Sequence, residues 1–350
     1  MNEYKKFEAI RAFVVSAPGK TRFEQKQMPE ISTDTDVLVK VRAVGICGSD
    51  MKILHGMNTV ATYPRVIGHE VAGEVVDTGP GVTTLAPGDH VVLEPIEYCG
   101  SCYACLHDRG NVCQNLRIRG INVDGGCQEY ITADESKLNR VSPDLKWTQA
   151  VMTEPYTLGQ QMLARARVRH EDVVAVFGMG PIGLIMVSTL KRFGVRQIIA
   201  TDVIESRLHL ARQLGAGHII NAGQEDVPAR LAKITGGMGP NVVVEASGIP
   251  QNFAMALETA SVAGTVVPMA FSGAPVTITT SPIGKKELNV AGSRLAAGKF
   301  PDMAKTLPLY REDIDAIVTH VFPFEQAAQA FEMAGSRASD VIKVVIVMEG

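Results

Sequence analysis

The sequence feature that most constrains the fold is a glycine-rich turn between an apolar strand and a helix. The motif Gly178-Met-Gly180-Pro-Ile-Gly183 directly follows the apolar run Val173–Phe177 and opens a helical pattern over Ile182–Phe193. In turns of this kind the glycines allow a tight bend, close approach of the backbone to a pyrophosphate, and contact between helix and strand. Because the first N–H groups of the helix can bind phosphate oxygens, the motif predicts a dinucleotide-binding βαβ unit.

An acidic residue at the end of the next strand favours NAD over NADP. Asp202 lies nineteen residues after Gly183, where a carboxylate can accept hydrogen bonds from the ribose hydroxyls and repels a 2′-phosphate. The next residues, Val203 and Ile204, offer no cation. A simple turn followed by a helix cap is the weaker alternative, because strand, glycines, helix and acid occur in the expected order. The other cofactor contacts that we expect are Pro181, Ile182, Arg207, Ser247 and Gly248.

Strand-like and helix-like runs alternate from residue 173 onwards. The strand-like runs are Val173–Phe177, Gln197–Thr201, His218–Asn221, Val242–Ala246, Thr265–Met269 and Leu288–Ala291, and the helix-like runs between them are Ile182–Phe193, Ser206–Leu214, Val227–Ile234 and Asn252–Ala260. This alternation is typical of βαβ units. It predicts an α/β fold of Rossmann type, with a doubly wound, six-stranded parallel sheet.

The first 150 residues indicate a different kind of domain. Short alternating apolar runs separated by Gly and Pro, such as Asp36–Val44 and Val71–Val76, predict a compact β domain. The tail, with a helix-like stretch at Phe324–Ala334 and an apolar strand at Val341–Val347, is expected to fold back onto it. We therefore expect one domain of residues 1–155 and 294–350, and a dinucleotide-binding domain of residues 156–293.

Length and charge set the class of protein. The chain has 350 residues, which corresponds to two domains at about 150 residues each, and its 46% apolar content excludes a disordered chain. A formal charge of −3 provides no electrostatic attraction to nucleic acid or to an anionic membrane surface. The apolar runs are too short to span a bilayer, and the N-terminus has no signal-peptide core. We expect a cytoplasmic protein.

Four of the six cysteines lie within fifteen residues of one another. Their spacing, Cys99-x2-Cys102-x2-Cys105-x7-Cys113, favours a closed four-thiolate site for a structural zinc ion. An iron–sulfur cluster is less consistent with the sequence, because bacterial ferredoxin runs place the fourth cysteine after three residues with proline next to it. A zinc knuckle for nucleic acid is disfavoured by the acidic charge balance.

Two fragments of the β domain contain further metal-ligand types. One is Gly45-Ile-Cys47-Gly-Ser49-Asp50, and the other is Gly68-His69-Glu70. Glu154 precedes Pro155, and a proline at the first helical position would place Glu154 at the helix cap. One thiolate, one imidazole and one carboxylate can hold a catalytic zinc ion with an open coordination position. Each residue alone is ambiguous, and the combination with a nucleotide fold decides the interpretation.

These motifs together resemble the zinc-dependent medium-chain dehydrogenases, in the sorbitol and threonine dehydrogenase branch. The resemblance covers the whole chain and rests on Val44–Asp50, Tyr63–Glu70, Gly88–Val91, the four-cysteine loop, Asp124–Gly126, Glu129-Tyr130, Thr153–Pro155 and the glycine motif. It implies a GroES-like β-barrel catalytic domain with a Rossmann domain inserted before its last segment. It also implies an enzyme that binds two zinc ions per chain and transfers hydride between a substrate hydroxyl and NAD.

The resemblance also implies roles for individual residues. Cys47, His69 and Glu154 correspond to protein ligands of the catalytic zinc, and Glu70 lies beside or on the metal. Asp50 corresponds to a carboxylate that orients His69, as ligating imidazoles usually require.

Proton transfer is where the chain departs from the pattern. Ser49 corresponds to the hydroxyl that takes the substrate proton. Many family members have a histidine five residues after the cysteine ligand, whereas this chain has Lys52. The proton can then leave through the ribose and water instead.

The substrate is less constrained by the sequence. The segments Gly292-Ser-Arg294-Leu and Lys299-Phe-Pro301 resemble dehydrogenases of L-galactonate and L-gulonate, so Arg294, followed by Lys52 and Arg65, is a candidate for binding a sugar-acid carboxylate. Contacts to the cofactor phosphates or a solvated surface are equally consistent with Arg294 and Lys299. Threonine or butanediol oxidation is an alternative within the family, and an NAD(H)-binding redox sensor is the alternative without catalysis. We expect a homodimer or homotetramer.

Overall fold

A computed structural model describes residues 8–270, 273–336 and 338–348. The chain forms two compact units. The first unit contains residues 1–154 and 296–350, and the second contains residues 155–295. These limits lie within two residues of the boundaries expected from the sequence.

The second unit contains the predicted six-stranded parallel sheet. Its order is β13 (His218–Asn221), β12 (Gln197–Asp202), β11 (Val173–Phe177), β14 (Val242–Glu245), β15 (Thr265–Pro268) and β16 (Asn289–Val290). In chain order this is 3-2-1-4-5-6, the doubly wound arrangement, so the expected fold class is confirmed. The last strand is shorter than the apolar run Leu288–Ala291, because the Leu288 N–H bonds the Ile283 carbonyl instead of a neighbouring strand.

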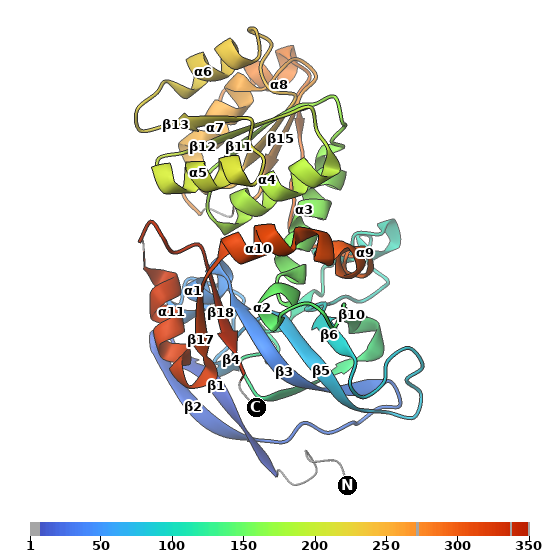
Figure 1. The fold of residues 1–350 in the computed structure, drawn as a ribbon. Helices are drawn as coiled ribbons and strands as arrows, with labels where there is room; N and C mark the ends of the chain where they lie inside the picture. The colour runs from blue at the N-terminus through green and yellow to red at the C-terminus, as the bar shows by residue number, and fades with distance from the viewer. Residues whose placement is uncertain (1–7, 271–272, 337, 349–350) are drawn as a thin grey trace. The chain divides into compact units, whose positions relative to one another are not determined.

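Helices cover both faces of this sheet. Helix α4 (Pro181–Phe193) packs against α5 (Glu205–Gln213), while α7 (Pro250–Thr259) contacts both α6 (Val227–Ile234) and α8 (Ser281–Lys285). Figure 1 shows the two groups on opposite sides of the strands. The strand order reverses between β11 and β14, the position at which open α/β sheets bind their ligands.

The first unit is built on a seven-stranded sheet. Its order is β10 (Leu138–Arg140), β6 (His90–Leu93), β5 (Glu70–Thr78), β3 (Asp36–Ile46), β18 (Lys343–Val347) and β17 (Val318–Pro323), with β9 (Tyr130–Asp134) also on β3. The C-terminal strand β18 lies antiparallel to β3, with Val344 opposite Ile46. The tail therefore returns to the first unit, as the sequence predicts.

Smaller elements complete the first unit. They are β1 (Ala9–Ala17), β2 (Lys20–Gln27), β4 (Arg65–Val66), β7 (Ile96–Glu97), β8 (Arg117–Ile118), α1 (Gly48–Leu54), α2 (Trp147–Ala150), α9 (Phe300–Thr306), α10 (Arg311–Ile317) and α11 (Ala327–Gly335). Helix α3 (Thr153–Ala166) begins in this unit and continues into the second.

Two elements of the tail differ from the sequence prediction. The predicted helix over Phe324–Ala334 begins with a 3₁₀ turn, Phe324–Gln326, which is common at helix starts. The strand predicted from Val341 begins at Lys343, because the Ile342 N–H bonds the Thr319 hydroxyl rather than a neighbouring strand.

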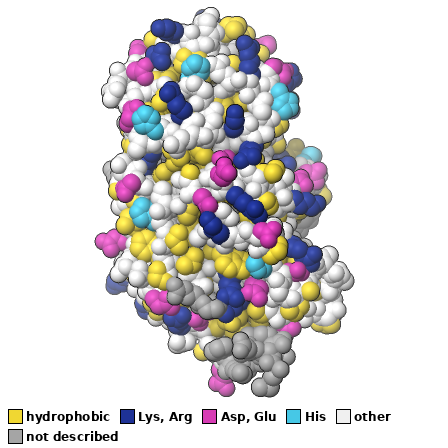
Figure 2. Space-filling model, viewed as in Figure 1, with side chains coloured by type: hydrophobic (Ala, Val, Ile, Leu, Met, Phe, Trp, Pro, Cys, Tyr) yellow, Lys and Arg dark blue, Asp and Glu magenta, His cyan; other side chains and the backbone are white. Residues whose placement is uncertain are grey.

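On the face drawn in Figure 2, basic and acidic side chains are interspersed rather than gathered by sign. No helix within the described ranges is both long enough and apolar enough to cross a membrane.

Candidate functional site

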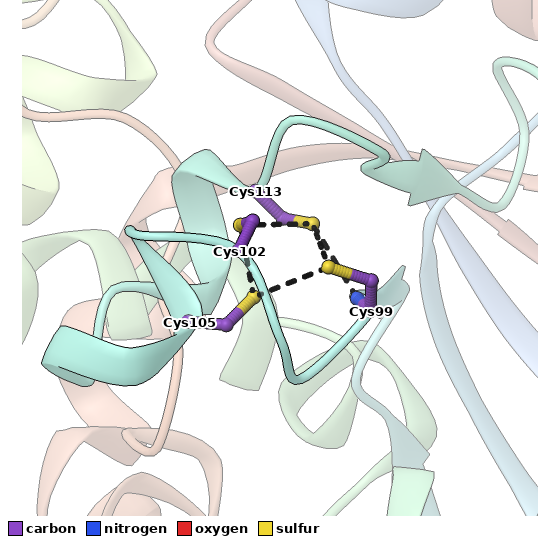
Figure 3. Close-up of side chains that lie close together, drawn as sticks. All are labelled: Cys99, Cys102, Cys105 and Cys113. Atoms are coloured by element: carbon purple, nitrogen blue, oxygen red, sulfur yellow. Dashed lines mark hydrogen bonds between the residues drawn. The ribbon is translucent and has the colours of Figure 1, made fainter.

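The four clustered cysteines converge on one point. Their sulfur atoms lie 3.5 Å apart between Cys99 and Cys113 and between Cys102 and Cys105, 3.8 Å apart between Cys102 and Cys113, and 4.0 Å apart between Cys99 and Cys105. Figure 3 shows all four side chains directed inward. A tetrahedron with Zn–S bonds of about 2.3 Å has edges of about 3.8 Å. The loop therefore fits one tetrahedral zinc ion without a disulfide.

Backbone N–H groups in this loop can stabilise thiolates by hydrogen bonding. The N–H groups of Cys99 and Asn115 point at the Cys113 sulfur, at 3.4 and 3.3 Å. Hydrogen bonds from the Ser101 backbone and hydroxyl lower the pKa of Cys99 to about 5. Burial and the Cys102 thiol raise the pKa of Cys105 to about 12. A dication at the centre deprotonates all four thiols, so metal binding and proton release are coupled.

The variant Cys102→Ser is expected to lower stability much more than turnover. Structural zinc contributes about 10–16 kcal/mol in small zinc domains, and about 1 kcal/mol shifts Tm by 2–4 °C in a domain of this size, so we expect a loss of about 10 °C or more. Calorimetry measures the change in Tm, and zinc analysis should show the loss of one zinc ion per chain. A variant that keeps its Tm and its zinc content would show that the loop is not a structural metal site.

The second group of metal-ligand atoms is formed by Cys47, His69 and Glu70. One ligand atom from each lies within 4.8 Å of the others. Cys47 is at the cap of α1, while His69 and Glu70 stand at the start of β5. The pairing of β3 with β5 places Gly45 opposite Glu70, and this register brings the two fragments together.

Asp50 connects the two fragments. Its Oδ2 accepts a hydrogen bond from the Cys47 N–H at 2.9 Å, and its Oδ1 accepts one from the Gly68 N–H at 3.3 Å. The same Oδ1 lies 3.4 Å from His69 Nδ1. Asp50 is completely buried, so its charge acts strongly on the imidazole. This is the contact expected of a carboxylate that orients a ligating histidine.

The protonation of His69 is controlled by these neighbours. Burial lowers the pKa of His69, but the Asp50 carboxylate and the Cys47 side chain raise it by more, so it lies well above its ordinary value. In the metal-free protein the imidazole therefore holds a proton that a metal ion must displace. Metal affinity should fall as the pH is lowered.

A buried lysine that the sequence analysis missed holds Glu70. Lys343 Nζ lies 2.6 and 2.5 Å from the two Glu70 carboxylate oxygens and donates to the Ile46 carbonyl at 3.0 Å. Both side chains are less than 5% exposed. A Cβ on Gly45 would overlap Glu70 Oε2, so only glycine leaves room for this carboxylate. The available signal was a lysine in the otherwise apolar strand Lys343–Val347.

Glu154 lies nearby but outside the 4.8 Å group. It is the second residue of α3, which begins at Thr153, so the prediction that Glu154 is the helix cap was wrong by two residues. Proline is tolerated throughout the first turn, since N–H groups there have no intrahelical partner. Burial raises the pKa of Glu154 to about 7, against the opposing effect of His69. Its carboxyl group can therefore change protonation near neutral pH.

The donor set fits a catalytic zinc ion. A thiolate, an imidazole and a carboxylate are the ligand types of zinc sites that keep a position open for substrate. The Ser49 hydroxyl lies 3.5 Å from His69 Nε2. Lys52 is exposed on α1, and Arg65 hydrogen bonds Asp124 and Thr62.

The glycine motif of the second unit has the geometry that a dinucleotide needs. Gly178 has a φ of 91°, and a Cβ there would come within 2.7 Å of Ser247 Cα. A Cβ on Gly183 would overlap the Gly178 carbonyl oxygen. The segment after β11 can approach the segment after β14 this closely only with glycine at position 178. The turn itself can close only with glycine at position 183.

Two carboxylates organise the loops at this end of the sheet. Asp202 accepts hydrogen bonds from the backbone N–H groups of Met179, Val203 and Ile204. Glu245, which is buried and was not predicted, accepts from the N–H groups of Ser247 and Gly248 at 2.8 and 3.1 Å. Pro181 and Ile182 open α4, Arg207 is half-buried on α5, and Arg294 is exposed in the second unit.

Comparison with known proteins identifies the family. Residues 33–143 match the alcohol dehydrogenase GroES-like domain, and residues 181–311 match the zinc-binding dehydrogenase domain. An uncharacterized zinc-type alcohol dehydrogenase-like protein of Haemophilus influenzae is 34% identical over 96% of this chain and 98% of its own length. The chain belongs to the zinc-dependent alcohol dehydrogenases.

Two further relatives describe this dehydrogenase more closely. Sorbitol dehydrogenase of Bacillus subtilis is 32% identical over 96% of this chain and 97% of its own length. A crystal structure of an alcohol dehydrogenase from Escherichia coli CFT073, complexed with NADH, has 32% identity and a TM-score of 0.92, covering 97% of this chain and all of that chain. The dehydrogenase is thus a zinc- and nicotinamide-dependent oxidoreductase with a GroES-like and a Rossmann domain.

Proposed function

We propose that this dehydrogenase oxidises a secondary hydroxyl of a polyol or a sugar acid of the L-gulonate or L-galactonate type, with NAD as hydride acceptor. The observation that carries the proposal is the convergence of Cys47, His69 and Glu70 beside the Ser49 hydroxyl. A bound zinc ion supplies Lewis acidity there, which lowers the pKa of a substrate hydroxyl, and NAD accepts the hydride.

The chain's own residues supply the rest of the chemistry. Ser49 Oγ accepts the proton of the substrate hydroxyl and passes it on toward solvent. Asp50 holds Cys47 and His69 in fixed positions relative to each other through its three contacts. Glu154, with a pKa of about 7, is the second carboxyl group available to the metal.

The preference for NAD rests on Asp202, and Asp202→Gly is expected to weaken it. Glycine has no side chain that could bond the ribose or repel a 2′-phosphate. The ratio of the kcat/KM value for NAD to that for NADP should therefore fall roughly ten- to a hundredfold. Steady-state kinetics with both cofactors measure this ratio. Asp202→Asn removes the charge and keeps one of the two oxygen acceptors for the backbone N–H groups. An unchanged ratio in both variants would assign cofactor selection to another residue.

A substrate screen tests the proposed activity. NAD reduction is measured with six-carbon aldonates, the corresponding alditols, butanediol and L-threonine. We expect the highest kcat/KM with an aldonate or an alditol. Preferred oxidation of threonine or butanediol would replace the proposed substrate class, and NADH binding without turnover of any alcohol would favour a redox sensor.

We also propose an oligomer and a cytoplasmic location. Strand β16 is the edge of the parallel sheet, and both of its residues are exposed, which supports strand pairing in a homodimer or homotetramer. All six cysteines are free thiols, which is typical of a reducing compartment.

A further inference from the structure

Arg119 is a largely buried cation with too little opposing charge. Its side chain is only 19% exposed, and within the described part of the chain its one ion pair joins Nε to Glu97 Oε1 at the long distance of 4.0 Å. The same Glu97 carboxylate also binds Arg117 Nη1 at 3.3 Å. One carboxylate is therefore shared by two arginines, and one positive charge is left without a counterion.

The neighbouring charges do not remove this excess. Asp124, whose charge acts on Arg119, is itself bound by both Lys26 and Arg65. The charges of Glu97, Arg117 and Asp36 also act on Arg119. The group therefore has four cations and three carboxylates, a surplus of one positive charge. Burial lowers the pKa of Arg119, and Arg117 lowers it further, against the opposing effect of Glu97. An anionic ligand would offset the cost of burying this guanidinium.

The backbone places Arg119 close to the catalytic metal group. The next residue, Gly120, packs on the segment that carries the ligands, since a Cβ on Gly120 would come within 2.9 Å of the Gly68 backbone. Gly68 directly precedes His69. Arg119 itself is anchored by its N–H, which donates to the Pro95 carbonyl at 2.9 Å. A long side chain from this position can reach the other end of a substrate whose hydroxyl lies at the metal group.

We propose that Arg119 is the specificity-determining residue that binds the carboxylate of a sugar-acid substrate. This inference rests on the proposed function and narrows its substrate class from polyols to aldonates. A guanidinium suits the task because its planar fork pairs with both carboxylate oxygens, whereas an ammonium acts as a point charge. The 19% of the Arg119 side chain that is still exposed is the part that a ligand would cover.

Other cations are less suited to this role. Arg65 already donates to Asp124 and Thr62 at 2.8 and 2.5 Å. Lys52 and Arg294 are exposed, and Arg294 lies in the second unit rather than with the metal ligands. Arg119 lies in the first unit with the metal-ligand group, and among the residues that the structure describes its one ion pair is 4.0 Å long.

The test compares Arg119→Gln with Arg117→Gln in the zinc-loaded enzyme. Arg117 is the matched control because it shares Glu97 but is 62% exposed. For a six-carbon aldonate, Arg119→Gln should lower kcat/KM about ten- to a hundredfold, mainly through KM, while the alditol of the same chain length loses less than about threefold. Arg117→Gln should change neither substrate by more than about threefold. Calorimetric titration of the aldonate into the enzyme–NADH complex should show the same loss of affinity.

Each outcome bears on the proposal. Arg119→Lys retains the charge and should recover part of the aldonate activity, which separates recognition from a folding defect. Equal losses for aldonate and alditol, or normal aldonate binding in Arg119→Gln, would overturn the role of Arg119 and leave the proposed function intact. A wild-type enzyme that oxidises alditols and no aldonate would overturn both this inference and the sugar-acid part of the proposed function.

Discussion

Replacing Cys47 or His69 by alanine is expected to lower turnover by about a thousandfold or more and to leave NADH affinity nearly unchanged. Each variant removes one of the three donors around the catalytic metal position. Metal catalysis contributes several kcal/mol to such reactions, and each 1.36 kcal/mol corresponds to a factor of ten in rate. The glycine motif belongs to the second unit, so the nucleotide site keeps all of its residues. Steady-state kinetics and fluorescence titration with NADH measure the two effects separately.

A histidine outside the site provides the control. His209 lies on α5 with its side chain 63% exposed, and its ion pair with Glu205 is a surface contact of little energetic value. His209→Ala should retain turnover and NADH affinity within about a factor of two. A loss of NADH affinity in His69→Ala as large as the loss of turnover would contradict the assignment of metal and nucleotide to separate sites.

Lys343→Met is expected to lower the free energy of unfolding of the zinc-free protein. The substitution leaves the Glu70 carboxylate buried without its counterion, and breaking a buried pair in this way costs about 3–5 kcal/mol. Met fills a similar volume, so the loss reflects charge rather than a cavity. Denaturant unfolding of the zinc-free protein measures this loss without a contribution from metal binding.

Two comparisons isolate the buried charge. Lys146 forms an exposed ion pair with Asp315, at 67% and 45% exposure, so Lys146→Met should cost less than about 1 kcal/mol. The double variant Lys343→Met with Glu70→Gln removes both charges and should recover much of the lost stability. If the double variant is as unstable as the sum of the single variants, Lys343 does not act through Glu70.

The sequence was most informative where the residues of a motif lie close together in the chain, so that local backbone geometry determines where they meet. Gly178, Gly183 and Asp202 lie on one strand–turn–helix unit and the strand after it, and the four cysteines lie on one loop. In both cases short-range backbone geometry decides where the side chains meet, so spacing alone predicted the nucleotide turn and the sulfur cluster. The doubly wound sheet of six parallel strands was predicted from the alternation of strands and helices.

Contacts between segments that lie far apart in the sequence could not be predicted from local sequence patterns. Lys343 meets Glu70 only because β18 pairs with β3, which in turn pairs with β5. Glu245 is an ordinary acid in the sequence, and its role appears only when β14 ends beside the Gly178 turn. Arg119 was not singled out either, because its shortage of counterions depends on which residues share Glu97. Side-chain charge is visible in a sequence, but its neutralisation is a property of the packed chain.

The most direct test of the central claim is a metal-depletion titration of the wild-type enzyme. Zinc is removed stepwise with a chelator, and zinc content, turnover and NADH affinity are measured on each fraction. The fully loaded chain should hold two zinc ions, one for each group of ligand atoms. Turnover should disappear in proportion to the zinc lost from the three-ligand site, while NADH affinity remains constant and readdition of zinc restores the rate. Full turnover in a chain that holds only the four-cysteine zinc would contradict the account.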